Sequence, residues 1–203
     1  VCSSDLNVND EDYCMNTSVS TSTFINNTAG TNGGAIDWFE GAVNGKVINS
    51  TFENNTAGEK GGAIYCDNKL TVLNSTFFNN DALNGGAIYT KDSTIESGIF
   101  LNNTAADRGG GLFTEGNSSI NNTLFDGNEI VNRTRYDTEW LNRGGAAIYS
   151  LGSLILNNSN ITNSEKDYVM RGHENAHLID GALTFTNTTV IANCIFENNS
   201  ACY

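Results

Sequence analysis

The cationic, histidine and aromatic residues that could bind a partner are concentrated in two long stretches, 129–143 and 165–180. Together they hold half of the ten Lys and Arg residues, both histidines and several aromatic rings. Cations beside aromatic rings suit sugar stacking or a protein interface, so we predict binding here, and also at Trp38 and Phe39 in a shorter insertion, 38–44. The alternative is that the loops only cover an apolar patch. The candidates in the long stretches are Arg133, Arg135, Tyr136, Trp140, Arg143, Arg171, His173 and His177.

These stretches interrupt a repeat made of two alternating strings, and repeats of this length indicate a solenoid. Gly-Gly-Ala-Ile occurs at 33–36, 61–64 and 85–88, with degraded copies at 109–112, 144–148 and 181–183. Phe-x-x-Asn begins at Phe24, Phe52, Phe77, Phe100, Phe125 and Phe196, with Ile161 in the remaining place. A third apolar segment precedes most Phe positions, as at 69–73, so the unit of about 24 residues carries three short strands.

Each repeated residue has a physical role in a stack of coils. Coils lie about 4.8 Å apart, so one Phe packs on the next, and Asn side chains at a fixed turn can form a ladder. Gly-Gly fits a corner where φ is positive or a side chain would clash. We predict an all-β, right-handed, single-stranded parallel β-helix of about seven coils. It forms one domain over 1–203, with an N-terminal cap region at 1–20 and the last coil at 190–203.

Composition limits the partners. A net charge of −13 disfavours nucleic acid or an anionic membrane surface, since both attract basic faces. No apolar run approaches the roughly 20 residues that span a bilayer, so we expect no membrane insertion by this fragment.

Cysteines and sequons indicate an oxidising, extracellular setting. Paired cysteines near both ends, Cys2 with Cys14 and Cys194 with Cys202, are expected to form disulfides that hold the terminal coils, the alternative being free thiols. Cys66 is expected to be a free buried thiol. Of thirteen Asn-x-Ser/Thr sequons, most follow from the repeat itself, and Asn132 in a long loop is the preferred glycosylation candidate.

The paired strings resemble the repeats of chlamydial polymorphic outer-membrane proteins, which are autotransporter adhesins. The longer form, Phe-x-Asn-Asn-Thr-Ala at 52–57 followed by Gly-Gly-Ala-Ile-Tyr at 61–65, is similar to adhesin-like surface proteins of methanogenic archaea. The resemblance runs over residues 13–200, but the coils after Asn128 carry long insertions and the coil around Ile161 lacks its Phe and Asn. It implies a cell-surface or secreted location and a cell-surface protein or glycan as the partner.

An enzyme of the pectate lyase or polygalacturonase kind is the competing hypothesis. Such enzymes need clustered Asp with a positioned Arg or Lys, whereas the regular coils present Asn, Ser, Thr, Gly and Ala. His173 stands beside Glu174 and four residues before His177, but a third metal ligand is missing. We therefore expect a non-enzymatic adhesin or binding module without a cofactor, with incidental calcium possible at acidic corners. A purely structural surface stalk is a further alternative.

Overall fold

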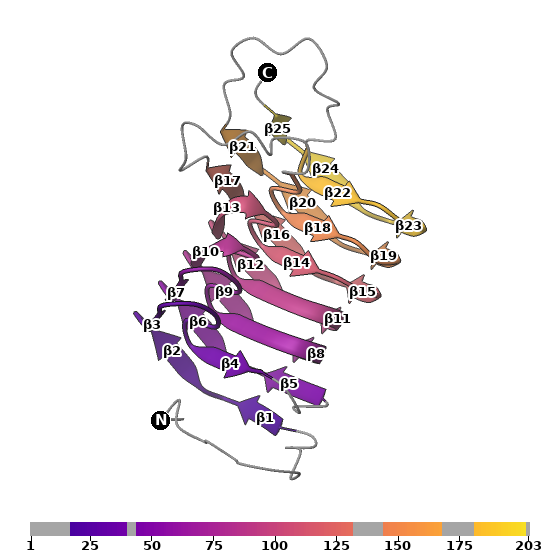
Figure 1. Cartoon of the computed structure of the whole chain (residues 1–203). Coiled ribbons are helices and arrows are strands. Elements are labelled where there is room, and N and C mark those ends of the chain that lie inside the picture. The colour runs from indigo at the N-terminus through magenta and orange to yellow at the C-terminus, as the bar shows by residue number, and fades with distance from the viewer. Residues whose placement is uncertain (1–16, 40–43, 132–143, 168–180, 202–203) are drawn as a thin grey trace.

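The computed structural model describes residues 17–39, 44–131, 144–167 and 181–201. Within these ranges the chain forms 25 strands and no helix, and it winds into a parallel solenoid (Figure 1). Every pairing between strands is parallel and joins one coil to the next. The predicted fold class, an all-β parallel β-helix, is confirmed.

Three sheets form the walls of the solenoid. The first has eleven strands, namely β1 (Thr17–Ser20), β4 (Ile36–Trp38), β5 (Asn44–Ile48), β8 (Ile64–Leu73), β11 (Ile88–Glu96), β14 (Leu112–Thr114), β15 (Ser118–Asn121), β18 (Ile148–Ser150), β19 (Leu154–Asn157), β22 (Leu183–Phe185) and β23 (Thr189–Ala192). The second has seven strands, namely β2 (Thr23–Ile25), β6 (Thr51–Glu53), β9 (Thr76–Phe78), β12 (Ile99–Leu101), β16 (Leu124–Asp126), β20 (Asn160–Thr162) and β24 (Ile195–Glu197). The third also has seven strands, namely β3 (Thr28–Ala29), β7 (Thr56–Ala57), β10 (Asp81–Asn84), β13 (Thr104–Arg108), β17 (Glu129–Val131), β21 (Glu165–Asp167) and β25 (Ser200–Ala201).

Each coil visits the three sheets in that order, and we number the coils along the chain. Coil 1 is β1–β3, coil 2 is β4–β7, coil 3 is β8–β10, coil 4 is β11–β13, coil 5 is β14–β17, coil 6 is β18–β21 and coil 7 is β22–β25. Each coil contributes one short strand to the second sheet and one to the third, as predicted, but the first sheet differs. On the first sheet coil 1 forms one strand of four residues, coils 3 and 4 each form one strand of nine or ten residues, and the other coils form two strands.

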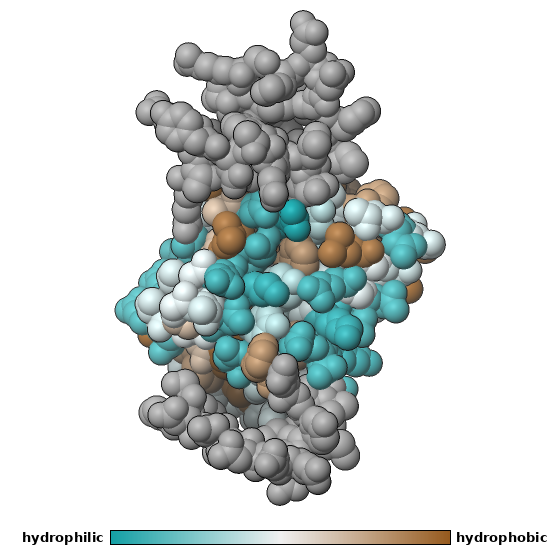
Figure 2. Space-filling view, in the orientation of Figure 1, coloured by the Kyte–Doolittle hydropathy of each residue, from teal (hydrophilic) through white to brown (hydrophobic). Residues whose placement is uncertain are grey.

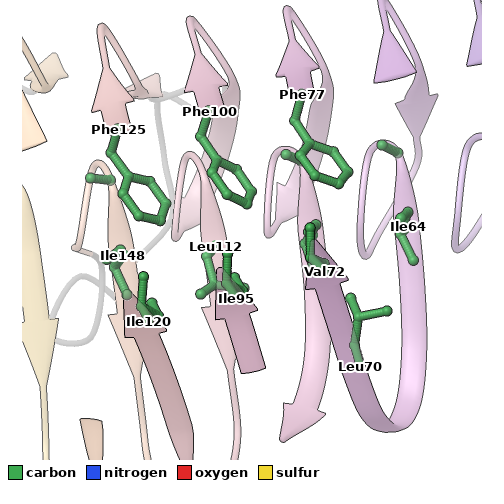
Figure 3. Close-up of a cluster of buried hydrophobic side chains, with 14 of the residues drawn as sticks. Ile64, Leu70, Val72, Phe77, Ile95, Phe100, Leu112, Ile120, Phe125 and Ile148 are labelled. Atoms are coloured by element: carbon green, nitrogen blue, oxygen red, sulfur yellow. The ribbon is translucent and has the colours of Figure 1, made fainter. Parts of the chain in front are cut away.

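The Phe positions form a single inward column, as predicted. They pair in register from coil 1 to coil 7, with Ile161 in coil 6. Ring centroids of consecutive Phe residues in coils 1 to 5 lie 4.6–4.9 Å apart, with interplanar angles of 4–12°. Figure 3 shows three of these rings above the Ile, Leu and Val side chains of the first sheet. Phe52, Phe77, Phe100 and Phe125 are fully buried, so the column is the centre of the core.

Phe196 departs from this prediction. It keeps the register, but 44% of its surface is exposed, and Ile191 and Ile195 beside it are exposed to a similar degree. A ring in this column is buried by the coils on both of its sides. Coil 7 is packed by a described coil on one side only.

The two asparagines of Phe-x-Asn-Asn have different roles at the corner that follows the Phe strand. The first, as in Asn54 and Asn79, has φ of 53–54°, the left-handed conformation that Asn tolerates. The second is buried and forms the predicted ladder: Nδ2 of Asn55 donates to Oδ1 of Asn80 (2.9 Å), and Nδ2 of Asn80 donates to Oδ1 of Asn103 (2.9 Å). The ladder runs from coil 1 to coil 5 and satisfies buried amides that would otherwise lose their hydration.

The two positions of Gly-Gly require glycine for different reasons. The first has positive φ, 65° at Gly61 and 66° at Gly85. The second lies against the backbone of the next coil. A Cβ on Gly62 would lie 2.1 Å from the carbonyl oxygen of Gly86 and 2.6 Å from that of Asp81. Only a residue without a side chain fits there, so the solenoid can be narrow at this corner.

Candidate binding surface

The two long insertions leave the solenoid at neighbouring points. They begin later than predicted, because 129–131 is strand β17 and 165–167 is strand β21. These strands pair in parallel, with Val131 opposite Asp167. The chain therefore departs from coils 5 and 6 at positions one coil apart.

The insertions also rejoin the solenoid at neighbouring points. Gly144 bridges to Arg108, and the amide of Gly109 donates to the carbonyl of Gly144 (3.1 Å). One coil further on, the amide of Ala146 donates to the carbonyl of Gly181 (3.1 Å). The expectation that equivalent corners of consecutive coils are stacked neighbours is confirmed for the bases of both insertions.

The side chains predicted to bind in the two long insertions lie outside the described residues, as does the preferred glycosylation candidate. These are Asn132, Arg133, Arg135, Tyr136, Trp140, Arg143, Arg171, His173 and His177. Because the bases are neighbours, we predict that Tyr136 and Trp140 of one insertion lie within reach of Arg171 or His173 of the other.

Beside the insertion bases runs a column of aromatic rings on the outer side of the first sheet. Tyr65, Tyr89, Phe113 and Tyr149 occupy the same position in coils 3 to 6. Their ring centroids lie 4.5–5.6 Å apart, and the rings are separate from the main core cluster. Although they point outward from the sheet, they are only 3–6% exposed. We call them the outer aromatic column.

Two cations lie over this column. Nζ of Lys60 lies 4.6 Å from the ring centroid of Tyr89 and 5.7 Å from that of Tyr65. The guanidinium of Arg108 lies 5.6 Å from the ring centroid of Tyr149 and forms an ion pair with Asp107 at 3.6 Å. Both cations come from the segment that enters the Gly-Gly corner, so they help to cover rings that would otherwise face solvent.

Two of the tyrosine hydroxyls in this column form hydrogen bonds with carboxylates. The hydroxyl of Tyr89 donates to Glu115, and that of Tyr65 pairs with Asp67. Burial, followed by the charge and hydrogen bond of Asp67, raises the pKa of Tyr65 to about 12. Burial and Glu115 raise the pKa of Tyr89, and burial raises that of Tyr149. All three are neutral donors at neutral pH. Since the ring faces cover one another, this column is a wall of the scaffold and has no face open for a sugar.

The Trp38 corner is only partly as predicted. Phe39 is 56% exposed and stacks on Tyr65 with a centroid distance of 6.3 Å, which extends the outer aromatic column. Trp38 is instead half-buried. Its register partner is Cys66, an inward position, and it packs against the core and lies over Gly45. Alternation along β4 places neighbouring side chains on opposite faces, so Trp38 and Phe39 cannot both point outward.

The disulfide expected at Cys194 is not formed. Cys194 is a free thiol in the column that holds Ser50, Ser75 and Ser159 in earlier coils, and its Sγ donates to the carbonyl of Ala192 (3.1 Å). It replaces a serine whose hydroxyl makes the same local bond, as Ser159 does to Asn157. Cys66 is free and fully buried, as predicted, and burial raises the pKa of its thiol. Cys2, Cys14 and Cys202 lie outside the described residues.

The described residues contain no group of three or more His, Cys, Asp or Glu side chains placed to hold a metal ion. No helix among them is long and apolar enough to cross a membrane. The face shown in Figure 2 is mainly hydrophilic, with apolar side chains scattered over it.

Sequence reasoning missed the outer aromatic column. Tyr follows Gly-Gly-Ala-Ile at 65 and 89, and the degraded copy ends in Tyr149. This recurrence was a usable signal, but strand alternation alone predicts that the side chain faces solvent. The burial comes from the neighbouring segment that carries Lys60 and Arg108, which no local pattern shows.

The fold and its ladders define a repeat-built parallel solenoid, and one family model matches its repeats. The Chlamydia polymorphic membrane protein repeat matches four times, over residues 21–37, 49–67, 74–91 and 97–115. The chain therefore carries repeats of this type in its first coils, as the resemblance implied. No curated protein and no solved structure matches the chain.

Proposed function

We propose that this chain is part of a non-enzymatic, extracellular surface protein that acts as an adhesin or binding module. In this proposal the laddered coils are the scaffold, and the two insertions bind a protein or glycan on another cell or in the matrix. The observation that carries it is the pairing of Val131 with Asp167, which places the bases of both insertions side by side.

Two further facts support the proposal. The repeats match those of a membrane-protein family of Chlamydia, which favours a cell-surface location. The insertions also hold four of the ten Lys and Arg residues of a chain whose net charge is −13, together with Tyr136 and Trp140. Cations and aromatic rings that are concentrated in two neighbouring loops suit a recognition surface.

The experiment removes the loops without disturbing the coils. Joining Val131 directly to Gly144 gives coil 5 the same connection that coil 3 has between Leu83 and Asn84. Replacing 168–180 by Asn-Gly gives coil 6 the same sequence at this corner. The loop-deleted chain should keep the circular dichroism and unfolding midpoint of the parent and lose binding to whole cells and glycan arrays.

Retained binding would move the site to the regular faces or to the Phe39 corner. Unfolding would show that the insertions are a structural cover. A chain that binds no cell, matrix protein or glycan, even with its loops, would favour a structural stalk. Turnover of polygalacturonate or pectin that is abolished by His173→Ala would favour the enzyme alternative.

A further inference from the structure

The asparagine ladder of the core is interrupted at one boundary. Between coils 4 and 5, Nδ2 of Asn103 donates to Oδ1 of Asn128 (3.0 Å), and the amide of Asn103 donates to the same oxygen (3.1 Å). In coil 6 the next position is Ser164, whose hydroxyl donates to Thr162 of its own coil (3.2 Å). The amide ladder is therefore interrupted between Asn128 and Ser164, and an Asn returns to this position only in coil 7, where Oδ1 of Asn199 accepts from the amide of Ser164 (3.0 Å).

The Phe column ends at the same boundary. Phe100 stacks on Phe125 with a centroid distance of 4.6 Å, but the register partner of Phe125 in coil 6 is Ile161. A buried bond still crosses the boundary at the corner between the first and second sheets, where the amide of Thr123 donates to Oγ of Ser159 (3.1 Å). On the second sheet itself the side-chain bonds lie nearer the surface, where Thr162 and Asn163 both donate to Asp126 at 2.7 Å. Bonds near solvent contribute less than buried ones, since water competes for both partners. The second and third sheets are thus weakened between coils 5 and 6.

The first sheet remains tied across this boundary. Phe113 of coil 5 stacks on Tyr149 of coil 6 with a centroid distance of 5.3 Å, and Arg108 lies over the same Tyr149 ring at 5.6 Å. Ile120 and its register partner Leu156 are both fully buried. The first sheet therefore keeps its side-chain contacts across this boundary, whereas the Phe stacking of the second sheet and the Asn ladder are both missing.

We propose that the boundary between coils 5 and 6 is a hinge. Coils 6 and 7 open from coil 5 along the second and third sheets, and the outer aromatic column holds the first sheet closed. Because Val131 and Asp167 pair on the opening side, each opening separates the bases of the two insertions. The hinge rests on the described coils and does not depend on the proposed binding role.

Four backbone amides provide a matched series for testing the hinge. Those of Asp81, Thr104, Glu129 and Glu165 each donate to the carbonyl of the ladder residue one coil earlier, at 2.9–3.0 Å. Only the Glu165 amide crosses the boundary where the ladder is missing. In native-state hydrogen exchange its protection factor should be lower than those of the other three by roughly tenfold or more, the equivalent of about 1.4 kcal/mol. The amide of Leu151, bonded to Thr114 (2.9 Å) on the first sheet, should stay protected.

Two variants sharpen the test. Ser164→Asn restores the ladder position and should raise the protection of the Glu165 amide towards that of Glu129. Asn103→Ser copies Ser164 of coil 6 into coil 4 and should lower the protection of the Thr104 amide by a similar factor. Equal protection of all four amides in the parent chain would overturn the hinge. So would a Glu165 amide that is unchanged in Ser164→Asn, or a Leu151 amide that exchanges as fast as Glu165.

Discussion

Coils 2 to 5 and coils 6 to 7 use the same backbone pairing but different side chains. In coils 2 to 5 each Phe position holds a fully buried ring and each ladder position a buried Asn. Coil 6 has Ile161 and Ser164 at these positions, and coil 7 has its Phe exposed. The difference teaches that parallel pairing is enough to continue the coil, whereas the side-chain columns set how firmly a coil is held.

The comparison also separates the coils that form the scaffold from the part of the chain that carries the long insertions. The family repeats match residues 21–115 in four segments, which end in coil 5. Both long insertions depart after that point, from coils 5 and 6. The insertions thus leave the solenoid on both sides of the boundary where the asparagine ladder is interrupted.

The largest effect should come from removing a ring from the centre of the Phe column. Phe77→Ala should lower the free energy of unfolding by about 3 to 5 kcal/mol, because the rings above and below leave an unfilled space. Phe196→Ala is the matched control and should cost about 1 kcal/mol or less, since that ring is already 44% exposed. Urea unfolding measures both. Equal losses would show that the two regions do not differ in packing.

A smaller effect is expected from the amide ladder. Asn80→Ala leaves the side chain of Asn55 without its acceptor and the amide of Asn55 unpaired, so we expect a loss of about 2 to 3 kcal/mol. Asn199→Ala in coil 7 should cost about 1 kcal/mol or less, because water can replace the bonds of this half-buried side chain to the amide of Ser164 and the carbonyl of Ile161. If the hydrogen bonds of the ladder did not stabilise the fold, Asn80→Ala would be tolerated as well as Asn199→Ala. The urea unfolding midpoints of the two variants would then coincide.

The sequence predicts most of the scaffold, because stacked coils turn a one-dimensional repeat into columns of identical residues. Phe77, Asn80 and Gly61 have the roles that the repeat implied. It fails where burial depends on neighbours outside the strand. Tyr65 is covered by the segment that carries Lys60, and Trp38 faces the core from β4, opposite Cys66. The free thiol of Cys194 follows from its place in a column of serines, and cysteine spacing gave no hint of it.

Alkaline pH should weaken the outer aromatic column. The pKa of Tyr65 is about 12 in the folded chain, against an ordinary value of 10.0. The folded state therefore keeps a proton that the unfolded chain releases, so stability is fully present below pH 10 and falls as pH rises towards 12. Urea midpoints measured over this range should fall less steeply for Tyr65→Phe than for the parent. Parallel slopes would contradict the role of Asp67 and burial at this ring.

The smallest effect concerns Lys60. Lys60→Met keeps the apolar stem over Tyr65 and Tyr89 but removes the charge, and it should cost about 0.5 to 1 kcal/mol. Lys46→Met, at an exposed position on β5, is the matched control and should change the unfolding free energy by less than about 0.5 kcal/mol. A thermal melt of both variants distinguishes a cation over rings from a general effect of charge.

The central claim is that neighbouring coils make a binding surface out of two loops, and a transplant tests it most directly. In the loop-deleted chain, 132–143 is inserted between Leu83 and Asn84, and 168–180 between Asp107 and Arg108, which are the same corner of coils 3 and 4. A control chain carries the same insertions on coils 1 and 4, at Thr31–Asn32 and Asp107–Arg108. The account predicts that cell binding returns in the first chain and stays absent in the second. Binding by both folded chains, or by neither, would contradict it.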